Sequence, residues 1–336
     1  MNVAFTICSN NYLAKAKVVA DTFITHHPDY EFLFFLVDII DNNLDYSTLG
    51  KYQLIQIHKI VPNIEELATK YNIVELNTAV KPAIFLYFLY KLNINTVIYL
   101  DPDLMIFNRF VEVEEELKKG NTNLVITPHF CSPIDDGKYP SEIDFMPFGL
   151  YNLGFIAIKN SIESKHFLKW WHERLMKYCY IQPDKAMFTD QLWVNYAPLF
   201  FNGVSILKHL GYNVANWNLY EREITVNDDV FYINQKYELK FFHFSNYQFD
   251  NPYIISKYQN RHNINDKPYL RLLIDKYQTQ LIDNKQADFS KSKCYYNLFY
   301  LNNQAEIKTK ADLEHYTFRR KLKNKVIYFV SSIFGE

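Results

Sequence analysis

The chain contains the stretch Val97-Ile98-Tyr99-Leu100-Asp101-Pro102-Asp103-Leu104, in which an apolar run leads directly into two carboxylates. Side chains at positions i and i+2 of an extended chain point to the same side, and Pro102 favours extended backbone at Asp101. Asp101 and Asp103 therefore leave the carboxyl end of a predicted strand together, which is where ligands bind in open α/β sheets. Although such a pair is often only a turn, two adjacent carboxylates repel each other unless a cation joins them. The stretch predicts a divalent-cation site.

Predicted strands and helices alternate on both sides of this stretch. The expected strands are Val3–Cys8, Glu31–Val37, Leu54–Ile60, Thr96–Leu100, Leu124–Thr127 and Asn152–Ile158, and the expected helices include Tyr12–His27, Asn63–Tyr71, Thr78–Leu92 and Thr189–Tyr196, with Thr189 as an N-cap. This order predicts an α/β fold with a mostly parallel sheet that helices cover on both faces. After residue 250 the pattern becomes helical and polar, with Lys267–Ile282 as the clearest helix.

The composition limits the class of protein. The 336-residue chain is 49% apolar and 22% charged, which predicts a folded protein with a sizeable core. Its formal net charge of −1 provides no field that would attract nucleic acid. Its 8 glycines are too far apart to form the GxGxxG dinucleotide fingerprint or a P-loop. A bound nucleotide would need another means of holding its phosphates, and a metal ion is the most direct one.

The first residues lack the basic leader of a signal peptide, and the 4 cysteines form no CxxC pair. The longest apolar runs, Phe32–Val37 and Ala83–Tyr90, are far shorter than the roughly 18–20 residues that span a bilayer. We therefore expect a cytoplasmic protein with reduced thiols that is not an integral membrane protein.

Five short motifs, in order along residues 1–250, resemble the retaining GT-A enzymes of glycosyltransferase family 8. They are Cys8-Ser9-Asn10-Asn11-Tyr12, the stretch from Val80-Lys81-Pro82 to Asp101-Pro102-Asp103, Tyr151-Asn152-Leu153-Gly154-Phe155, Thr189-Asp190-Gln191 and Phe242-His243-Phe244. The resemblance implies a GT-A catalytic domain over residues 1–250, with a Rossmann-like mixed sheet flanked by helices. A C-terminal helical extension with a basic and aromatic tail would cover residues 251–336.

The resemblance also implies roles for individual residues. His243 would join Asp101 and Asp103 as the third metal ligand, and an imidazole among carboxylates favours Mn²⁺ over Mg²⁺. Asp190 and Gln191 would lie near the anomeric carbon, with Asp190 either attacking it or supporting an oxocarbenium-like ion pair. Donor contacts are expected from Tyr12, stacked on a uracil base, and from Asn10, Asn11, Lys81 and Asn152.

The chain departs from the family pattern after His243. The family usually has Gly and then Lys-Pro-Trp there, whereas this chain reads Ser245-Asn246-Tyr247 and so lacks a phosphate-binding lysine. Arg222 or Lys257 are candidates to replace it.

The tail is the last feature that the pattern singles out. Five basic residues lie within Arg319–Lys325 and adjoin the apolar and aromatic segment Val326–Phe334. Residues 318–336 are expected either to contact the inner face of a membrane peripherally or to pack on the domain as a terminal helix.

Together these features predict a metal-dependent glycosyltransferase. It would move a hexose from a nucleotide sugar, expected to be a UDP-sugar, to a glycan, lipid-linked or protein acceptor, with retention of configuration. Two alternatives are a glycoside hydrolase that uses a carboxylate pair and a non-catalytic module that binds nucleotide sugars or carbohydrate.

Overall fold

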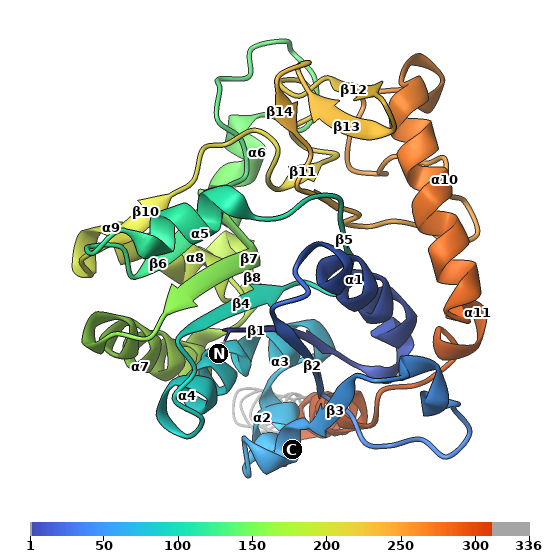
Figure 1. The fold of residues 1–336 in the computed structure, drawn as a ribbon. Helices are drawn as coiled ribbons and strands as arrows, with labels where there is room; N and C mark the ends of the chain where they lie inside the picture. The colour runs from blue at the N-terminus through green and yellow to red at the C-terminus, as the bar shows by residue number, and fades with distance from the viewer. Residues whose placement is uncertain (1, 311–336) are drawn as a thin grey trace, which may run out of the picture.

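A computed structural model describes residues 2–310 and shows a seven-stranded sheet with helices on both sides (Figure 1). The strand order is β10-β6-β7-β4-β1-β2-β3. The strands are β1 (Asn2–Cys8), β2 (Glu31–Leu36), β3 (Gln53–Gln56), β4 (Thr96–Leu100), β6 (Leu124–Pro128), β7 (Tyr151–Lys159) and β10 (Val204–Ile206). Each pairing among these described strands is parallel except the two that β7 makes with β4 and β6. The predicted α/β class with a mostly parallel, mixed sheet is confirmed.

The two faces of the sheet carry separate cores because side chains alternate along each strand. On β1, Phe5 and its alternate neighbours face one core, whereas Ala4 and Cys8 face the other. The first core lies under α2 (Ile64–Lys70), α3 (Ile73–Ala79), α4 (Lys81–Tyr90) and α7 (Ile162–Tyr178). The second lies under α1 (Leu13–His26) and α5 (Val111–Lys118).

Smaller sheets stand at the carboxyl ends of the central strands. Strand β5 (Leu104–Ile106) follows Asp103 and pairs antiparallel with β15 (Phe241–His243), which pairs with β11 (Val214–Ala215). This register sets His243 opposite Leu104, one residue after Asp103. The other strands and α-helices before residue 250 are β8 (Ile181–Gln182), β9 (Met187–Phe188), β12 (Ile224–Asn227), β13 (Val230–Ile233), β14 (Tyr237–Glu238), α6 (Glu142–Phe145), α8 (Gln191–Val194) and α9 (Ala197–Phe200).

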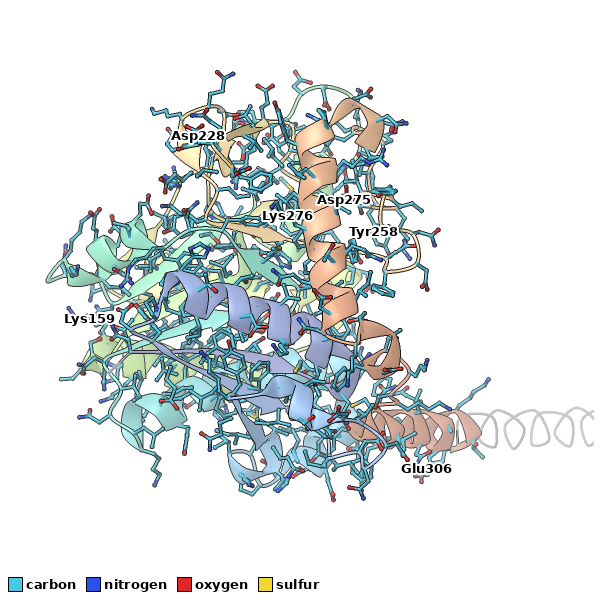
Figure 2. All side chains as sticks on the ribbon, turned by 45° about the vertical axis from the view of Figure 1, so that its right-hand side comes forward. Lys159, Asp228, Tyr258, Asp275, Lys276 and Glu306 are labelled. Carbon is cyan, nitrogen blue, oxygen red and sulfur yellow. The ribbon has the colours of Figure 1, made fainter. Side chains whose placement is uncertain are left out.

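The segment after residue 250 begins with a long loop and continues as α10 (Pro268–Asp283) and α11 (Gln286–Phe289). Figure 2 shows α10 with Asp275 and Lys276 on it, Tyr258 in the loop beside it, and the helical residues 295–310 with Glu306 extending from the body. The apolar face of α10 shares one core with Val18 of α1 and with β15. Division of the chain at residue 250 stays a prediction, and the tail over residues 318–336 lies outside the described residues.

One stretch of the described chain, Ile73–Tyr90, has the length and apolar character of a membrane span, with 18 residues and a mean hydropathy of 1.2. It consists of α3 and α4, and 56% of it is buried within the fold. Phe85 and Phe88 of α4 pack against Phe5 of the central strand. Core packing accounts for its apolar character.

Candidate active site

The two carboxylates and the histidine that the sequence singled out lie together at the carboxyl end of β4. Nε2 of His243 is 3.2 Å from Oδ1 of Asp103 and 3.8 Å from Oδ2 of Asp101. One ligand atom from each residue lies within 4.8 Å of the others. Asp101 is fixed by its backbone N–H, which donates to the Gly154 carbonyl at 2.8 Å. The pairing of β5 with β15 brings His243 to this place from far along the chain.

The charges of these three side chains shift one another's pKa values. Burial lowers the pKa of His243, but the charges of Asp103 and Asp101 outweigh it, so the net shift is upward. Burial raises the pKa of Asp101. Burial acts in the same direction on Asp103, but the neighbouring His243 outweighs it and lowers the pKa. A divalent cation would bind these groups with the carboxylates ionised and the imidazole neutral, and would therefore compete with protons for them.

Gly154 gives these groups room to meet. A Cβ at this position would lie 2.7 Å from Cε1 of His243, 2.8 Å from Oδ1 of Asn152 and 3.0 Å from Oδ2 of Asp101. Because real Cβ atoms do not approach other heavy atoms so closely, glycine is required here for steric reasons.

A buried ion pair joins Lys81, in the first turn of α4, to Asp190, which directly precedes α8. Nζ of Lys81 is 2.5 Å from Oδ2 of Asp190, donates to the Leu153 carbonyl at 3.0 Å and lies 4.0 Å from the centre of the Tyr99 ring. The Tyr99 hydroxyl donates to Oδ1 of Asp101. Tyr99 and Lys81 therefore connect the proposed catalytic carboxylate to a proposed metal ligand. Tyr99 was not predicted as a site residue, although its spacing of two residues from Asp101 places both on one side of the chain.

Gln191 and Asn152 face the same region. The Gln191 amide donates to the Phe148 carbonyl at 2.8 Å. The Asn152 amide donates to Nε2 of His129 at 3.3 Å, and its Oδ1 accepts the Gly154 N–H at 3.1 Å. His129 was not predicted, because nothing near it in the sequence shows that the residue directly after β6 lies beside Asn152.

The predicted nucleotide loop lies at the carboxyl end of β1. The Asn10 side chain is buried and engaged, since it donates to the Ile39 carbonyl at 2.9 Å and accepts from the Tyr46 hydroxyl at 2.7 Å. Asn11 is half-buried, and Tyr12 is 38% exposed, so part of its ring is open to a ligand. The ammonium of Lys15 lies 4.5 Å from the centre of that ring.

A cavity of about 590 Å³ opens in front of the candidate metal ligands and the Lys81–Asp190 pair, and the predicted nucleotide loop over residues 10–12 does not line it. The long segment between β6 and β7 forms one wall through Tyr139, Pro140 and Phe148. The ring of Trp217, also not predicted, lies 5.3 Å from that of His243. Site residues that line the cavity are Lys81, Asp101, Asp103, His129, Asn152, Gly154, Asp190, Gln191, Trp217 and His243.

Arg222 is not brought into this cavity, so the structure does not support it as a phosphate-binding residue. Its guanidinium is buried and donates to the carbonyls of Leu210 and Tyr212 and to Oε1 of Glu221. Lys257, the other candidate, is exposed, with its ammonium 4.9 Å from the Tyr258 ring.

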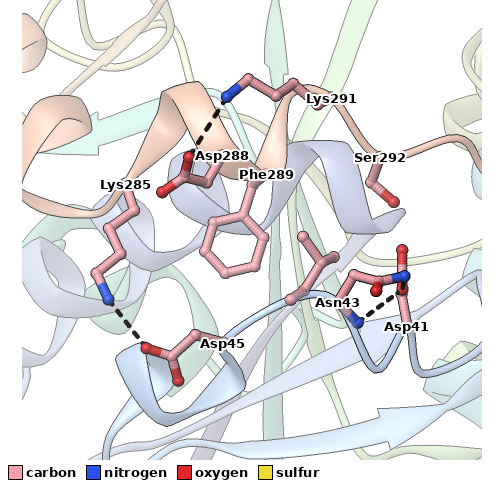
Figure 3. Close-up of a pocket in the computed structure, with 9 residues that line it drawn as sticks. Asp41, Asn43, Asp45, Lys285, Asp288, Phe289, Lys291 and Ser292 are labelled. Carbon is pink, nitrogen blue, oxygen red and sulfur yellow. Dashed lines mark hydrogen bonds and ion pairs between the residues drawn. The ribbon is translucent and has the colours of Figure 1, made fainter.

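A second cavity, of about 370 Å³, lies between the segment after β2 and α11 (Figure 3). Its charged groups pair with one another: Lys285 with Asp45 at 2.9 Å, and Lys291 with Asp288 at 3.5 Å. None of the predicted site residues lines it.

Two uncharacterized proteins of Bacillus subtilis (strain 168) are similar to this chain. YfnF is 27% identical over 161 residues, which cover 45% of this chain and 50% of YfnF. YfnD is 24% identical over 247 residues, which cover 72% of this chain and 76% of YfnD. No protein-family model matches the chain.

Among solved structures, the galactosyltransferase LgtC in complex with donor and acceptor sugar analogues is similar, with a TM-score of 0.51 and 16% sequence identity. The likeness covers 84% of this chain and 96% of LgtC. The chain has the GT-A fold. The fold implied by the five motifs is confirmed, and the Asp101 motif ends the central GT-A strand β4.

The GT-A fold implies a divalent cation, and the residues present fit one. Asp101 and Asp103 offer the oxygen ligands that Mg²⁺ and Mn²⁺ prefer, and His243 offers a nitrogen ligand that Mn²⁺ accepts more readily. Nε2 of His243 faces both carboxylates and is the ring nitrogen that would bind the cation, whereas Nδ1 is buried without a hydrogen-bond partner among residues 2–310.

Proposed function

We propose that this protein is a metal-dependent glycosyltransferase that moves a hexose from a nucleotide sugar, a UDP-sugar, to a glycan, lipid-linked or protein acceptor. The observation that carries the proposal is the cluster of Asp101, Asp103 and His243 at the ligand-binding edge of a GT-A sheet. A cavity of about 590 Å³ in front of the cluster is large enough for a sugar.

The position of each residue in the site suggests its role. Asp101, Asp103 and His243 would hold the cation, which when bound supplies positive charge against the leaving diphosphate. Tyr12 would stack on the base, and Asn152 and Gln191 would orient the donor sugar.

Asp190 would lie beside the anomeric carbon, where its negative charge stabilises a positively charged sugar. Because one of its oxygens already accepts from Lys81, we favour this role over covalent attack. Transfer on the same face of the sugar then retains the configuration. Proton NMR of fresh product decides this point, since an inverted product would contradict it.

Release of nucleoside diphosphate from a panel of nucleotide sugars tests the proposed activity. We expect turnover with a UDP-sugar and Mn²⁺, and loss of turnover in excess EDTA and in Asp103→Ala. Equal turnover in EDTA would argue for metal-independent chemistry, as in a glycoside hydrolase. Tight binding of UDP-sugar without any turnover would argue for a binding module.

We also propose that the tail, residues 318–336, brings the protein to the cytoplasmic face of a membrane. The support is the sequence alone, in which five basic residues adjoin an apolar segment. Full-length protein should co-sediment with anionic vesicles in a salt-sensitive manner, whereas a chain ending at Thr317 should not. Equal sedimentation of the two would remove the tail from membrane binding.

A further inference from the structure

Lys15 lies in the first turn of α1, three residues after Tyr12, with its ammonium 4.5 Å from the centre of the Tyr12 ring. The residue is only 9% exposed. Within residues 2–310 its ammonium forms no hydrogen bond and no ion pair. The Nζ atom is not among the fully enclosed polar atoms, so a ligand can reach it, and a largely buried cation without a protein partner favours a nearby anion.

The surroundings of Lys15 identify where that anion would lie. Helix α1 packs against β5, which begins one residue after Asp103. Burial lowers the pKa of Lys15, and the charge of Asp103 opposes that shift, so the two side chains are close enough to act on each other. Lys15 therefore lies beside the aromatic ring of the predicted base site, on a helix that packs against the strand directly after Asp103.

A second buried polar group beside the same residues also lacks a partner. Tyr277 of α10 is fully buried, its ring stacks on Phe244 at 3.7 Å, and its hydroxyl has no hydrogen-bond partner among the described residues. Burial raises the pKa of Tyr277, and the charges of Asp103 and Tyr12 act in the same direction. Helix α10 packs against α1, so this unpartnered hydroxyl lies in the same part of the fold as Lys15.

Of the other cations that could bind a phosphate, Lys81 and Arg222 are bonded to protein acceptors and Lys257 is exposed. Lys81 is held by Asp190 and the Leu153 carbonyl, and the guanidinium of Arg222 is held by backbone carbonyls outside the cavity. Lys257 is exposed on the loop before α10. Lys15 is thus the buried cation near the Asp101 and Asp103 pair that is not already committed to a protein acceptor.

We propose that Lys15 binds the diphosphate of the nucleotide-sugar donor, in place of the lysine that is missing after His243; this assignment rests on the proposed function. Charge balance supports it. Each phosphate of the donor carries a negative charge, and Asp101 and Asp103 add two more, so one divalent cation leaves an excess of negative charge. Lys81 does not reduce this excess because Asp190 already neutralises it. The ammonium of Lys15 reduces it and adds charge-assisted hydrogen bonds.

Calorimetric titration of UDP and of uridine, each with Mn²⁺ and again in EDTA, tests the assignment. Lys15→Met should weaken UDP binding by about 10- to 100-fold in both conditions and leave uridine binding unchanged, because uridine carries no phosphate. Lys15→Arg, which keeps the charge, should recover part of the UDP affinity. The matched control is Lys17→Met, which removes the same charge from the same helix but breaks only the pair with Asp21.

The outcomes separate the two proposals. Wild-type protein that binds no nucleotide would remove the proposed function and this assignment with it. Wild-type protein that binds UDP while Lys15→Met binds it equally well would overturn the assignment and leave the function standing. An equal loss of UDP and uridine binding would also overturn it, because Lys15 would then support the base site.

Discussion

Gly154 shows how strongly a single residue constrains the site. Its missing side chain lets the imidazole of His243, the amide of Asn152 and the carboxylate of Asp101 converge on one point of β7. The sequence shows a glycine within a strand, which indicates a close approach by another group. Only the structure shows that the group is the candidate metal site.

Gly154→Ala should therefore abolish metal binding at modest cost to the fold. The added methyl group must displace one of three site groups, with an overpacking cost of about 1–3 kcal/mol. We expect the rise in melting temperature that Mn²⁺ causes in the wild type to disappear. Gly120→Ala is the control, because a Cβ there would meet nothing within 4 Å. A normal Mn²⁺ response in Gly154→Ala would contradict this account of the site.

Lys81 and Asp190 form a buried pair whose halves depend on each other. Lys81→Met should lower the free energy of unfolding by about 3–5 kcal/mol, because it leaves the buried charge of Asp190 without a partner. The double variant Lys81→Met, Asp190→Asn should recover part of that loss, since no charge remains. Urea denaturation measures all three proteins. A double variant less stable than Lys81→Met would show that the pair is not coupled in this way.

At the scale of elements, local patterns predicted strands better than ends of helices. The strand over Thr96–Leu100 was predicted with its observed bounds, because a continuous apolar run ends at Asp101. The helix expected over Thr78–Leu92 is present as α4, Lys81–Tyr90, but it begins later than expected, and Thr78 belongs to the preceding helix α3. The structure has α3 and α4, and Pro82 cannot donate a backbone hydrogen bond to join them.

Contacts distant in sequence explain the remaining differences. Thr189 was expected to cap a helix but has a left-handed φ of 44°, and α8 begins after Asp190. The tertiary pair with Lys81 decides the conformation there, and sequence patterns do not contain it. Trp217 and Lys15 were missed for the same reason. Asp101 and Asp103 were found from their spacing at the end of a predicted strand, whereas His243 was found because the order of the family's motifs stands in for the missing spatial information.

The loop at residues 136–141, which borders the cavity, is held by hydrogen bonds from Asn260 and Arg261. Arg261 donates to both oxygens of Asp136 and to the carbonyls of Lys138 and Pro140. The Tyr139 N–H donates to Oδ1 of Asn260 at 2.8 Å. These bonds hold a wall of the cavity in place.

Asp136→Asn should loosen this wall and leave the global fold intact. We expect faster amide hydrogen exchange over residues 136–141 and an unchanged melting temperature, because the pair is exposed on the Asp136 side. Asp29→Asn is the control, since Asp29 makes a similar two-bond pair with Arg109. That pair lies beside Thr96, at the amino ends of the central strands and away from the cavity. Unchanged exchange over residues 136–141 in Asp136→Asn would show that Arg261 does not fasten the wall.

For the whole molecule, buried histidines set the response to acid. Burial lowers the pKa of His27, His129 and His262 to about 4 in each case. His27 can meet its bonds only as a neutral ring, because Nδ1 donates to the Phe23 carbonyl and Nε2 accepts the Phe110 N–H. Between about pH 6.5 and pH 4 the unfolded chain therefore binds more protons than the folded one at these sites.

The free energy of unfolding should consequently fall as the pH drops through that window. The raised pKa values of His243, Asp38 and Asp101 act in the opposite sense, since their contributions are present at acid pH and lost as pH rises. The lowered pKa values of His26, His172 and His209 add to those of the first three histidines, so the lowered group is the larger one. Urea denaturation in EDTA at a series of pH values measures the slope. His27→Gln should make the slope shallower, whereas His166→Gln, at an exposed site, should not. Stability that rises towards acid would contradict this prediction.

The central claim is that a divalent cation joins Asp101, Asp103 and His243 to the diphosphate of a nucleotide. Anomalous diffraction from crystals grown with Mn²⁺ and UDP tests it most directly. We expect a manganese peak bounded by the two carboxylates, the imidazole and both phosphates, with the uracil base stacked on the Tyr12 ring. An ordered nucleotide with manganese bound elsewhere, or with no manganese beside its phosphates, would contradict it.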